Sequence, residues 1–240
     1  MKKLTLTIVC ALAVTGAALA QGTLMWSSFV PTAITAQTNA TVCSPLFGGG
    51  STGGGTVGAT AGGATAFYYE LLYNTAFTGS QIASPTLAAL TDGSWIDSGL
   101  EATNTGIAGR ILPIAPSTQA SVAGWAGGIG SLGGKTNNIV LVGWSANLGT
   151  SWSVVSGELA NWGFNPLFPN AYFGESTTGY LVPNQGNPGC TVFVTTATLN
   201  GLPINSVNTQ LYLLPTPEPS TIALAGLGGF TLLLFRRRKQ

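Results

Sequence analysis

The chain has 240 residues, of which 6% are charged and 45% hydrophobic, and its formal net charge is +1. Soluble domains usually carry about 25% charged residues, so hydroxyl and amide groups must hydrate much of this surface. Residues 21–216 hold two basic residues against six acidic ones: Arg110 and Lys135 against Glu70, Asp92, Asp97, Glu101, Glu158 and Glu175. Nucleic-acid binding needs a basic face that neutralises phosphates, so this composition excludes it.

Residues 1–20, "MKKLTLTIVCALAVTGAALA", have the pattern of a secretory signal peptide. Two lysines precede a short apolar stretch, and small residues stand at Ala18 and Ala20. This order of charged region, apolar region and A-x-A site predicts cleavage between Ala20 and Gln21. The alternative is a first transmembrane helix, which the short run and the cleavage site disfavour.

The next segment, 21–214, has a length that suits one domain. Alternating apolar residues with β-branched and aromatic enrichment predict strands near 23–30, 65–74, 107–114, 119–125, 138–146, 171–175, 190–197 and 208–214. Residues 150–162 instead place Trp152, Val155 and Leu159 at helical spacing, which predicts one short helix. We therefore expect a mainly β domain, a β-sandwich of jelly-roll or immunoglobulin-like type.

Residues 48–63, "GGGSTGGGTVGATAGG", contain nine glycines in sixteen positions. Glycine-rich segments of this kind behave as flexible connections because glycine restricts the backbone so little. We expect a flexible loop or a long connection between strands rather than a second domain.

The chain has three cysteines, and Cys10 lies in the predicted signal peptide. The remaining pair, Cys43 and Cys190, predicts a disulfide, since an even number of cysteines in an exported protein usually forms bridges. A loop of this length would stabilise the fold by about 4–5 kcal/mol in the chain-entropy model. The alternative is two free buried thiols.

The sequence contains no histidine, which excludes Ser-His and Cys-His catalysis and the usual zinc sites. The densest acidic stretch, "TDGSWIDSGLE", holds Asp92, Asp97 and Glu101. Three interpretations stay open for it: an acid/base pair of a hydrolase, a calcium loop of unusual spacing, and a polar turn between strands, which we favour. We expect no catalytic, cofactor or metal site.

Six tryptophans also need an interpretation. Large aromatic residues most often fill the core, although on a β-sandwich an exposed row of them can stack on sugar rings. Trp144, within "IVLVGWSA", is expected in the core. Trp95, Trp125 and Trp162 lie beside turn residues and are the candidates for an exposed sugar platform.

An apolar run of fifteen residues, 221–235, lies close to the C-terminal end and precedes a basic cluster of Arg236, Arg237, Arg238 and Lys239. As a helix it would span about 22 Å, against roughly 30 Å for the hydrocarbon core of a bilayer. Snorkelling basic side chains and local thinning allow such a short span to hold. The basic cluster predicts a cytoplasmic stop, and the short helix suits a temporary anchor.

Pro217, Glu218 and Pro219 precede this helix. Proline, an apolar helix and an arginine cluster in this order resemble the PEP-CTERM sorting signal, here residues 215–240. The resemblance implies that a membrane-embedded exosortase recognises Pro217, Glu218 and Pro219 and removes the helix. The two prolines also prevent helix formation and leave an extended segment at the membrane surface. A plain single-pass anchor is the alternative.

These observations together predict a non-enzymatic exported protein of the cell surface or extracellular matrix. Its precursor is held in the inner membrane and processed through its C-terminal signal. The exosortase and the membrane are the expected partners, and exopolysaccharide and further copies of the chain are candidates. A carbohydrate-binding module associated with exopolysaccharide is the main alternative, and a secreted hydrolase is the less favoured one.

Overall fold

The structure, a computed structural model, describes residues 21–26, 33–47, 57–60, 65–115, 119–128, 133–162, 168–186 and 188–215. The predicted signal peptide, most of the glycine-rich segment 48–63, and the sorting signal from residue 216 onward lie outside these residues. The part of the glycine-rich segment that is described contains a short strand, β3 (Val57–Ala59), which pairs with β2 (Ile34–Cys43). This part of the segment therefore extends the sheet.

Eight strands follow one another in the path of a large sheet, in the order β3-β2-β13-β9-β8-β4-β5-β6. The bounds not yet given are β4 (Phe67–Asn74), β5 (Ile96–Asn104), β6 (Ile111–Ala115), β8 (Asn137–Ser145), β9 (Tyr172–Glu175) and β13 (Ser206–Leu213). Two short strands, β10 (Gly179–Leu181) and β12 (Gly201–Leu202), extend it beside β8. The pair β2/β13 is parallel, and the other pairs of this sheet are antiparallel.

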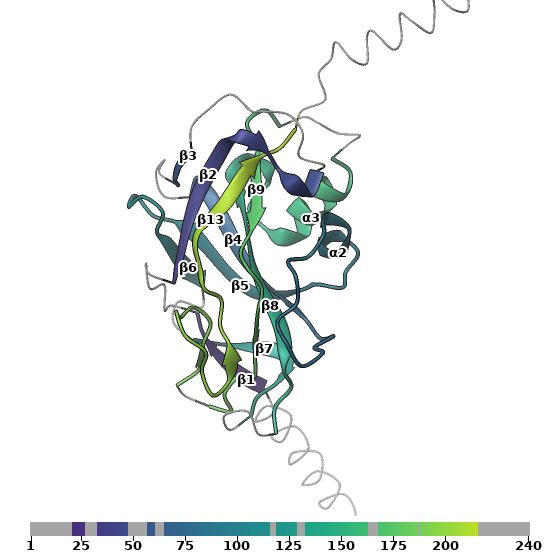
Figure 1. The fold of residues 1–240 in the computed structure, drawn as a ribbon, viewed down its shortest axis with the longest axis vertical. Helices are drawn as coiled ribbons and strands as arrows, with labels where there is room; N and C mark the ends of the chain where they lie inside the picture. Colours follow the sequence, from purple (N-terminus) through teal and green to yellow (C-terminus); the bar gives the residue numbers. More distant parts are fainter. Residues whose placement is uncertain are drawn as a thin grey trace, which may run out of the picture.

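A second sheet has three strands in the order β11-β1-β7: β11 (Cys190–Thr191), β1 (Gln21–Met25) and β7 (Gln119–Ala126). It lies at one end of the long axis of the molecule, and the large sheet curls away from it like half a barrel (Figure 1). At the other end the large sheet is covered by α2 (Leu87–Thr91), α3 (Trp152–Ala160) and the 3₁₀ turns η1 (Pro45–Phe47) and η2 (Ala146–Leu148).

The centre of the large sheet is the pair β4/β8, which stays in register over eight residue pairs. Every residue of β8 is buried, because both faces of this strand are covered. Side chains alternate between the faces of a strand, so Ile139 and Leu141 join one core and Val140 and Val142 join the other. At Gly143 an added Cβ would lie 2.6 Å from the ring of Tyr69, so glycine lets that ring pack on the strand.

The two cores differ in what covers the sheet. The first lies between the large sheet, the three-stranded sheet and the segment around Phe193, and it contains Trp26, Tyr73 and Trp125. The second lies under α2 and α3 and contains Trp144, Trp152, Trp162 and Phe173, among others. Stacked rings join neighbouring elements in the first core, as between Tyr73 and Trp125, whose centroids lie 5.1 Å apart. Together the cores explain how a chain with so few charges buries its aromatic residues.

The prediction of a mainly β domain is confirmed, and the sandwich type, jelly-roll or immunoglobulin-like, stays a prediction. The expected helix is α3, and its three predicted apolar positions, Trp152, Val155 and Leu159, are all buried. Strands were predicted correctly at β4, β7, β8, β9 and β13. Sequence analysis missed β2, whose "ITAQTNATVC" is mostly polar, and β5, which it interpreted as a turn. It also predicted one helix where the described residues contain two, since α2 was not expected.

The predicted Cys43–Cys190 disulfide is wrong, since both residues are buried thiols. Cys43 ends β2 opposite Leu213, whereas Cys190 pairs with Leu24 of β1 in the other sheet. These strands lie towards opposite ends of the long axis (Figure 1). The even number of cysteines therefore reflects two separate apolar positions, one in each half of the domain, and not a bridge.

We expect both thiols to react with a maleimide only after unfolding. Cys190 is 3% exposed, and burial raises the pKa of its thiol to about 12, so the reactive thiolate is scarce in the native state. Peptide mapping without reductant should show Cys43 and Cys190 unmodified in native protein and both modified in denaturant. If both cysteines stayed unmodified in denaturant until a reductant was added, the protein would contain the disulfide after all.

Candidate functional site

The last described residues of the chain are tied to the second core. Strand β13 ends at Leu213, and the side chain of Leu214 is 2% exposed in that core. The amide of Leu214 donates to the carbonyl of Ala171 at 2.8 Å. The indole Nε1 of Trp162 then donates to the carbonyl of Pro215 at 2.7 Å. We call Leu214, Pro215 and Trp162 the C-terminal exit.

Trp162 follows α3, and its indole is itself held in place. It is 3% exposed and packs edge-on against Phe47 of η1, with ring centroids 6.2 Å apart. The ring of Phe168 stacks on it at 6.5 Å. A buried indole N–H needs an acceptor, and the carbonyl of Pro215 supplies it. The folded domain therefore holds the chain to within two residues of Pro217.

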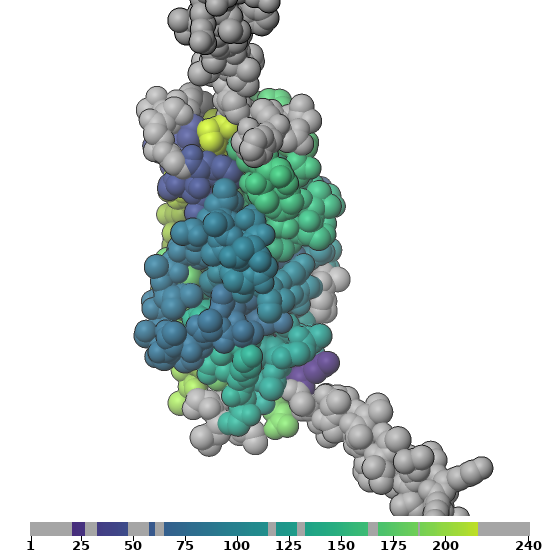
Figure 2. Space-filling model, turned by 90° about the vertical axis from the view of Figure 1, so that its right-hand side faces the viewer, coloured from purple at the N-terminus to yellow at the C-terminus, as the bar shows by residue number. Residues whose placement is uncertain are grey.

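The C-terminal exit lies at the opposite end of the domain from β1. Figure 1 shows β1 at one end of the long axis, and β13 leads the chain to the other. In Figure 2 the end of β13, in yellow, emerges at the top of the molecule between β2 and the green surface of α3. Gln21, the first residue after the predicted signal peptide, is exposed at the far end. A membrane anchor after Pro215 would thus face the helical end of the domain.

The three tryptophans that were candidates for an exposed sugar platform are buried, as most large aromatic residues are. Trp95, Trp125 and Trp162 are 4%, 0% and 3% exposed, so none of them offers a ring face to solvent. The other three tryptophans are equally buried. The indole N–H groups of Trp26, Trp125, Trp144 and Trp162 donate to backbone carbonyls. The fold itself therefore supplies the acceptor that each of these buried indoles needs.

The acidic stretch 91–101 divides between two structural roles. Asp92 follows α2 as its C-terminal cap and accepts from the amide of Ser94 at 2.8 Å. Asp97 and Glu101 belong to β5, where Asp97 accepts from the amide of Gly99 at 2.7 Å. Among the described residues no group of three His, Cys, Asp or Glu side chains could hold a metal ion. The calcium-loop interpretation has no support here.

Strand pairing brings a third carboxyl group, Glu70 of β4, to Asp97 and Glu101. Glu70 is 1% exposed, and its Oε1 is buried without a hydrogen-bond partner. Burial, a hydrogen bond to Asp97 and the charges of Asp97 and Glu101 raise the pKa of Glu70 to about 10. Sequence analysis missed this residue because Glu70 lies in an apolar strand far from the acidic stretch.

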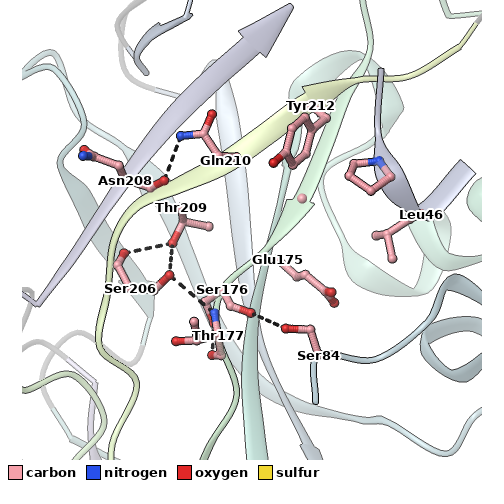
Figure 3. A pocket seen from close by; sticks show the side chains of 12 residues that line it. Leu46, Ser84, Glu175, Ser176, Thr177, Ser206, Asn208, Thr209, Gln210 and Tyr212 are labelled. Atoms are coloured by element: carbon pink, nitrogen blue, oxygen red, sulfur yellow. Dashed lines mark hydrogen bonds between the residues drawn. The ribbon is translucent and has the colours of Figure 1, made fainter. Parts of the chain in front are cut away.

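A pocket of about 310 Å³ opens between β9 and β13 on the face that carries η1 (Figure 3). The two strands pair only at Tyr212 with Phe173 and Leu213 with Tyr172. Beyond that point β13 continues along β2 and β9 along β8, and the pocket occupies the gap. At Gly174 an added Cβ would lie 1.9 Å from the carbonyl oxygen of Gln210, so only glycine allows the strands to approach at the floor.

Glu175 is the one acidic residue that lines the pocket. In Figure 3 its carboxyl group lies on the side of Leu46 and Ser84. Its Oε2 is buried without a hydrogen-bond partner, and burial raises the pKa of the carboxyl group to about 8. No sequence pattern marked this residue, because the pocket joins four segments that are spread along the chain from Pro45 to Tyr212.

Comparison with protein-family models identifies the segment that follows the C-terminal exit. Residues 215–239 match the model of the PEP-CTERM protein-sorting motif. The chain carries a PEP-CTERM protein-sorting motif. No curated protein and no solved structure matches the chain.

A PEP-CTERM motif implies an exported protein that is processed by an exosortase, and it therefore implies contact with a membrane. The matched range includes Pro217, Glu218, Pro219, the apolar run 221–235 and the basic residues from Arg236 to Lys239, whose individual roles stay predictions. Within the described residues, which end at Pro215, no helix is long and apolar enough to span a membrane. The signal peptidase site at Ala20 and Gln21 stays a prediction.

We expect Glu70→Gln to flatten the pH dependence of stability. The folded protein keeps the Glu70 proton up to about pH 10, whereas the unfolded chain releases it above about pH 4.5. Between these values the free energy of unfolding falls with pH, by up to about 1.4 kcal/mol per unit. Urea unfolding at pH 5 and pH 8 should show a smaller loss of stability in the variant. Glu158→Gln on α3 is the control, and an identical loss in all three proteins would contradict the burial of a neutral Glu70.

Trp162→Phe should loosen the C-terminal exit without unfolding the domain. The change removes the hydrogen bond to Pro215 and keeps an aromatic ring, at a cost of about 1 kcal/mol. Hydrogen exchange at the amide of Leu214 should become faster. Trp144→Phe removes a similar bond to Gly149 and should leave exchange at Leu214 unchanged. Equal exchange at Leu214 in wild type and Trp162→Phe would show that Trp162 does not hold the exit.

Proposed function

We propose that this is a non-enzymatic exported protein of the cell surface or extracellular matrix, released from an inner-membrane precursor when an exosortase cuts at its C-terminal motif. The observation that carries the proposal is the PEP-CTERM match at residues 215–239. The fold supports it, because the described part of the domain reaches Pro215, where the match begins. Removal of everything after the motif would leave both cores intact.

The two ends of the domain also suit this route. Cleavage after Ala20 would begin the mature chain at Gln21, the first residue of β1, which is exposed at one end. The apolar run 221–235, stopped by the basic cluster Arg236–Lys239, would hold the precursor from the other end. Both cuts would thus leave every described strand and helix in the mature chain.

The absence of histidine from the sequence and the structural roles of Asp92 and Asp97 support a non-enzymatic role. A secreted hydrolase would need two carboxyl groups on either side of a substrate, and Glu70 is 1% exposed. The burial of the tryptophans removes the first argument for a carbohydrate-binding module. Exopolysaccharide and further copies of the chain stay candidate partners, because residues 21–216 carry few charges and a weakly charged surface repels its own copies little.

Processing is tested by the intact mass of the protein from its native host. We expect a mature chain that begins at Gln21 and ends near Pro219. Glu218→Ala should leave the uncut form in the membrane fraction, because it removes the one charge of the motif. Glu158→Ala, which changes a carboxyl group on α3 instead, should be processed like the wild type.

A host that lacks an exosortase should accumulate the uncut wild-type precursor. Native protein that ends at Gln240 would make the tail an ordinary anchor and overturn the proposal. Normal cutting after replacement of Pro217, Glu218 and Pro219 together would place recognition in the helix or the basic cluster.

A further inference from the structure

Apolar side chains surround the point where the chain leaves the domain. We call six residues of this surface the exit rim: Val42, Pro45, Leu46, Phe47, Phe168 and Pro169. Three of them, Val42, Pro45 and Pro169, are exposed, and the other three are half-buried. Val42 is 43% exposed at the end of β2. The rim therefore offers apolar surface to whatever lies beyond the C-terminal exit.

Direct contacts tie the exit rim to the C-terminal exit. The rings of Phe47 and Phe168 pack on Trp162, whose indole binds the chain at the exit. The amide of Ser44 donates to the carbonyl of Leu213 at 3.0 Å, which joins the end of β2 to the end of β13. Figure 2 shows the surface of β2 bordering the yellow end of β13 at the top of the molecule. The rim and the exit therefore keep a fixed position relative to each other.

The segments that form the rim carry no charge. Residues 42–69 and 159–174 contain no acidic and no basic residue. Among α2, α3, η1 and η2, which cover this end of the large sheet, Glu158 is the one charged residue. Lys135 lies at the far end, where its amide donates to Ala126 of β7. A surface without charges can approach hydrocarbon without the large cost of desolvating an ion.

Little chain separates the exit from the proposed anchor. Residues 216–220 join Pro215 to the apolar run 221–235, and a chain of this length spans at most about 18 Å when fully extended. With the run in the bilayer, the exit stays within that distance of the membrane surface. So short a tether makes the contact between rim and lipid effectively intramolecular, at a high local concentration.

We propose that the exit rim rests in the headgroup interface of the membrane for as long as the precursor is anchored. The partner is the lipid surface itself, and phenylalanine and aliphatic side chains are of the kind that enter this interface. The inference rests on the anchor of the proposed function and adds a contact made by the domain. Because even one acyl chain gives only marginal membrane binding, we expect the rim to leave the lipid once the tether is cut.

The test uses the full-length precursor, made in a host without an exosortase and reconstituted into vesicles of phosphatidylethanolamine and phosphatidylglycerol. A fluorophore is attached at Val42→Cys on the rim or, as the control, at Leu199→Cys. The native thiols of Cys43 and Cys190 are buried and should not react, which labelling of the wild type checks. The absence of an exosortase ensures that any contact at the rim is made with lipid or with another copy of the chain.

The control site lies at the opposite end of the domain. Leu199 is 88% exposed, and its neighbour Asn200 donates to Asn184, which bridges to Thr23 of β1. Lipids that carry a nitroxide on carbon 5 of an acyl chain quench fluorophores in the interface. We expect them to quench the label at position 42 at least about threefold more than the label at position 199, because groups in the interface lie about 5–10 Å into the boundary of headgroups and acyl chains.

A charge placed on the rim should lift it from the lipid. Pro169→Asp changes an exposed rim residue and should reduce the quenching at position 42 by at least about twofold, since an ionised carboxylate is costly to desolvate. Leu199→Asp adds the same charge at the far end and should leave that quenching unchanged. Thermal melting confirms that each variant is folded.

The outcomes separate this inference from the anchor on which it rests. Equal quenching at positions 42 and 199 in vesicle-bound precursor, or unchanged quenching in Pro169→Asp, would overturn the inference and leave the anchor intact. A precursor that does not float with the vesicles would overturn the anchor, and the inference with it. Shielding of position 42 from iodide that rises with protein density, without quenching by the nitroxide lipid, would assign the rim to a second copy of the chain and overturn the lipid contact.

Discussion

The pairing of β4 with β8 is the constraint on which the rest of the molecule depends. Every residue of β8 is buried, so the strand needs a cover on each face. The three-stranded sheet and the segment around Phe193 supply one cover, and α2 and α3 supply the other. The two cores meet only through this strand pair and its neighbours. A polar residue at Leu141 or Val142 would therefore leave an unsatisfied group in one core and weaken the support of the other.

The same arrangement separates the ends of the domain. Strand β1 belongs to the small sheet and β13 to the large one, so the chain enters at one end of the long axis and leaves at the other (Figure 1). The exit is fixed by Trp162, whose ring is packed by η1 and by Phe168. A membrane anchor within the matched range 215–239 would therefore follow the helical end of the domain and not the three-stranded sheet. The second core fixes the end of the domain at which Pro215 lies.

Sequence patterns correctly predicted the elements whose buried residues form one continuous apolar run or recur at one regular spacing. Strand β8 is an unbroken apolar run and α3 has three apolar residues at helical spacing, and both were predicted. Strand β2 was missed because it alternates threonine, alanine and asparagine, and its partner β13 lies more than a hundred and sixty residues away. Long-range strand pairing also determines where the cysteines and tryptophans lie. The composition gives only their number. Glu175 and its pocket depend on where β9 and β13 part, and no local pattern encodes that point.

The low charge of the domain explains why its buried acids behave as neutral groups. Ion pairing usually keeps a buried carboxylate ionised, but residues 21–215 contain only Arg110 and Lys135 as basic side chains. Burial and nearby acids therefore raise the pKa of Glu70 to about 10, and burial alone raises that of Glu175 to about 8. Each therefore stays protonated in the folded protein, which costs stability as the pH rises. Glu70 lies where β4 pairs with β5, beside Asp97 and Glu101, whereas Glu175 lies at the pocket between β9 and β13.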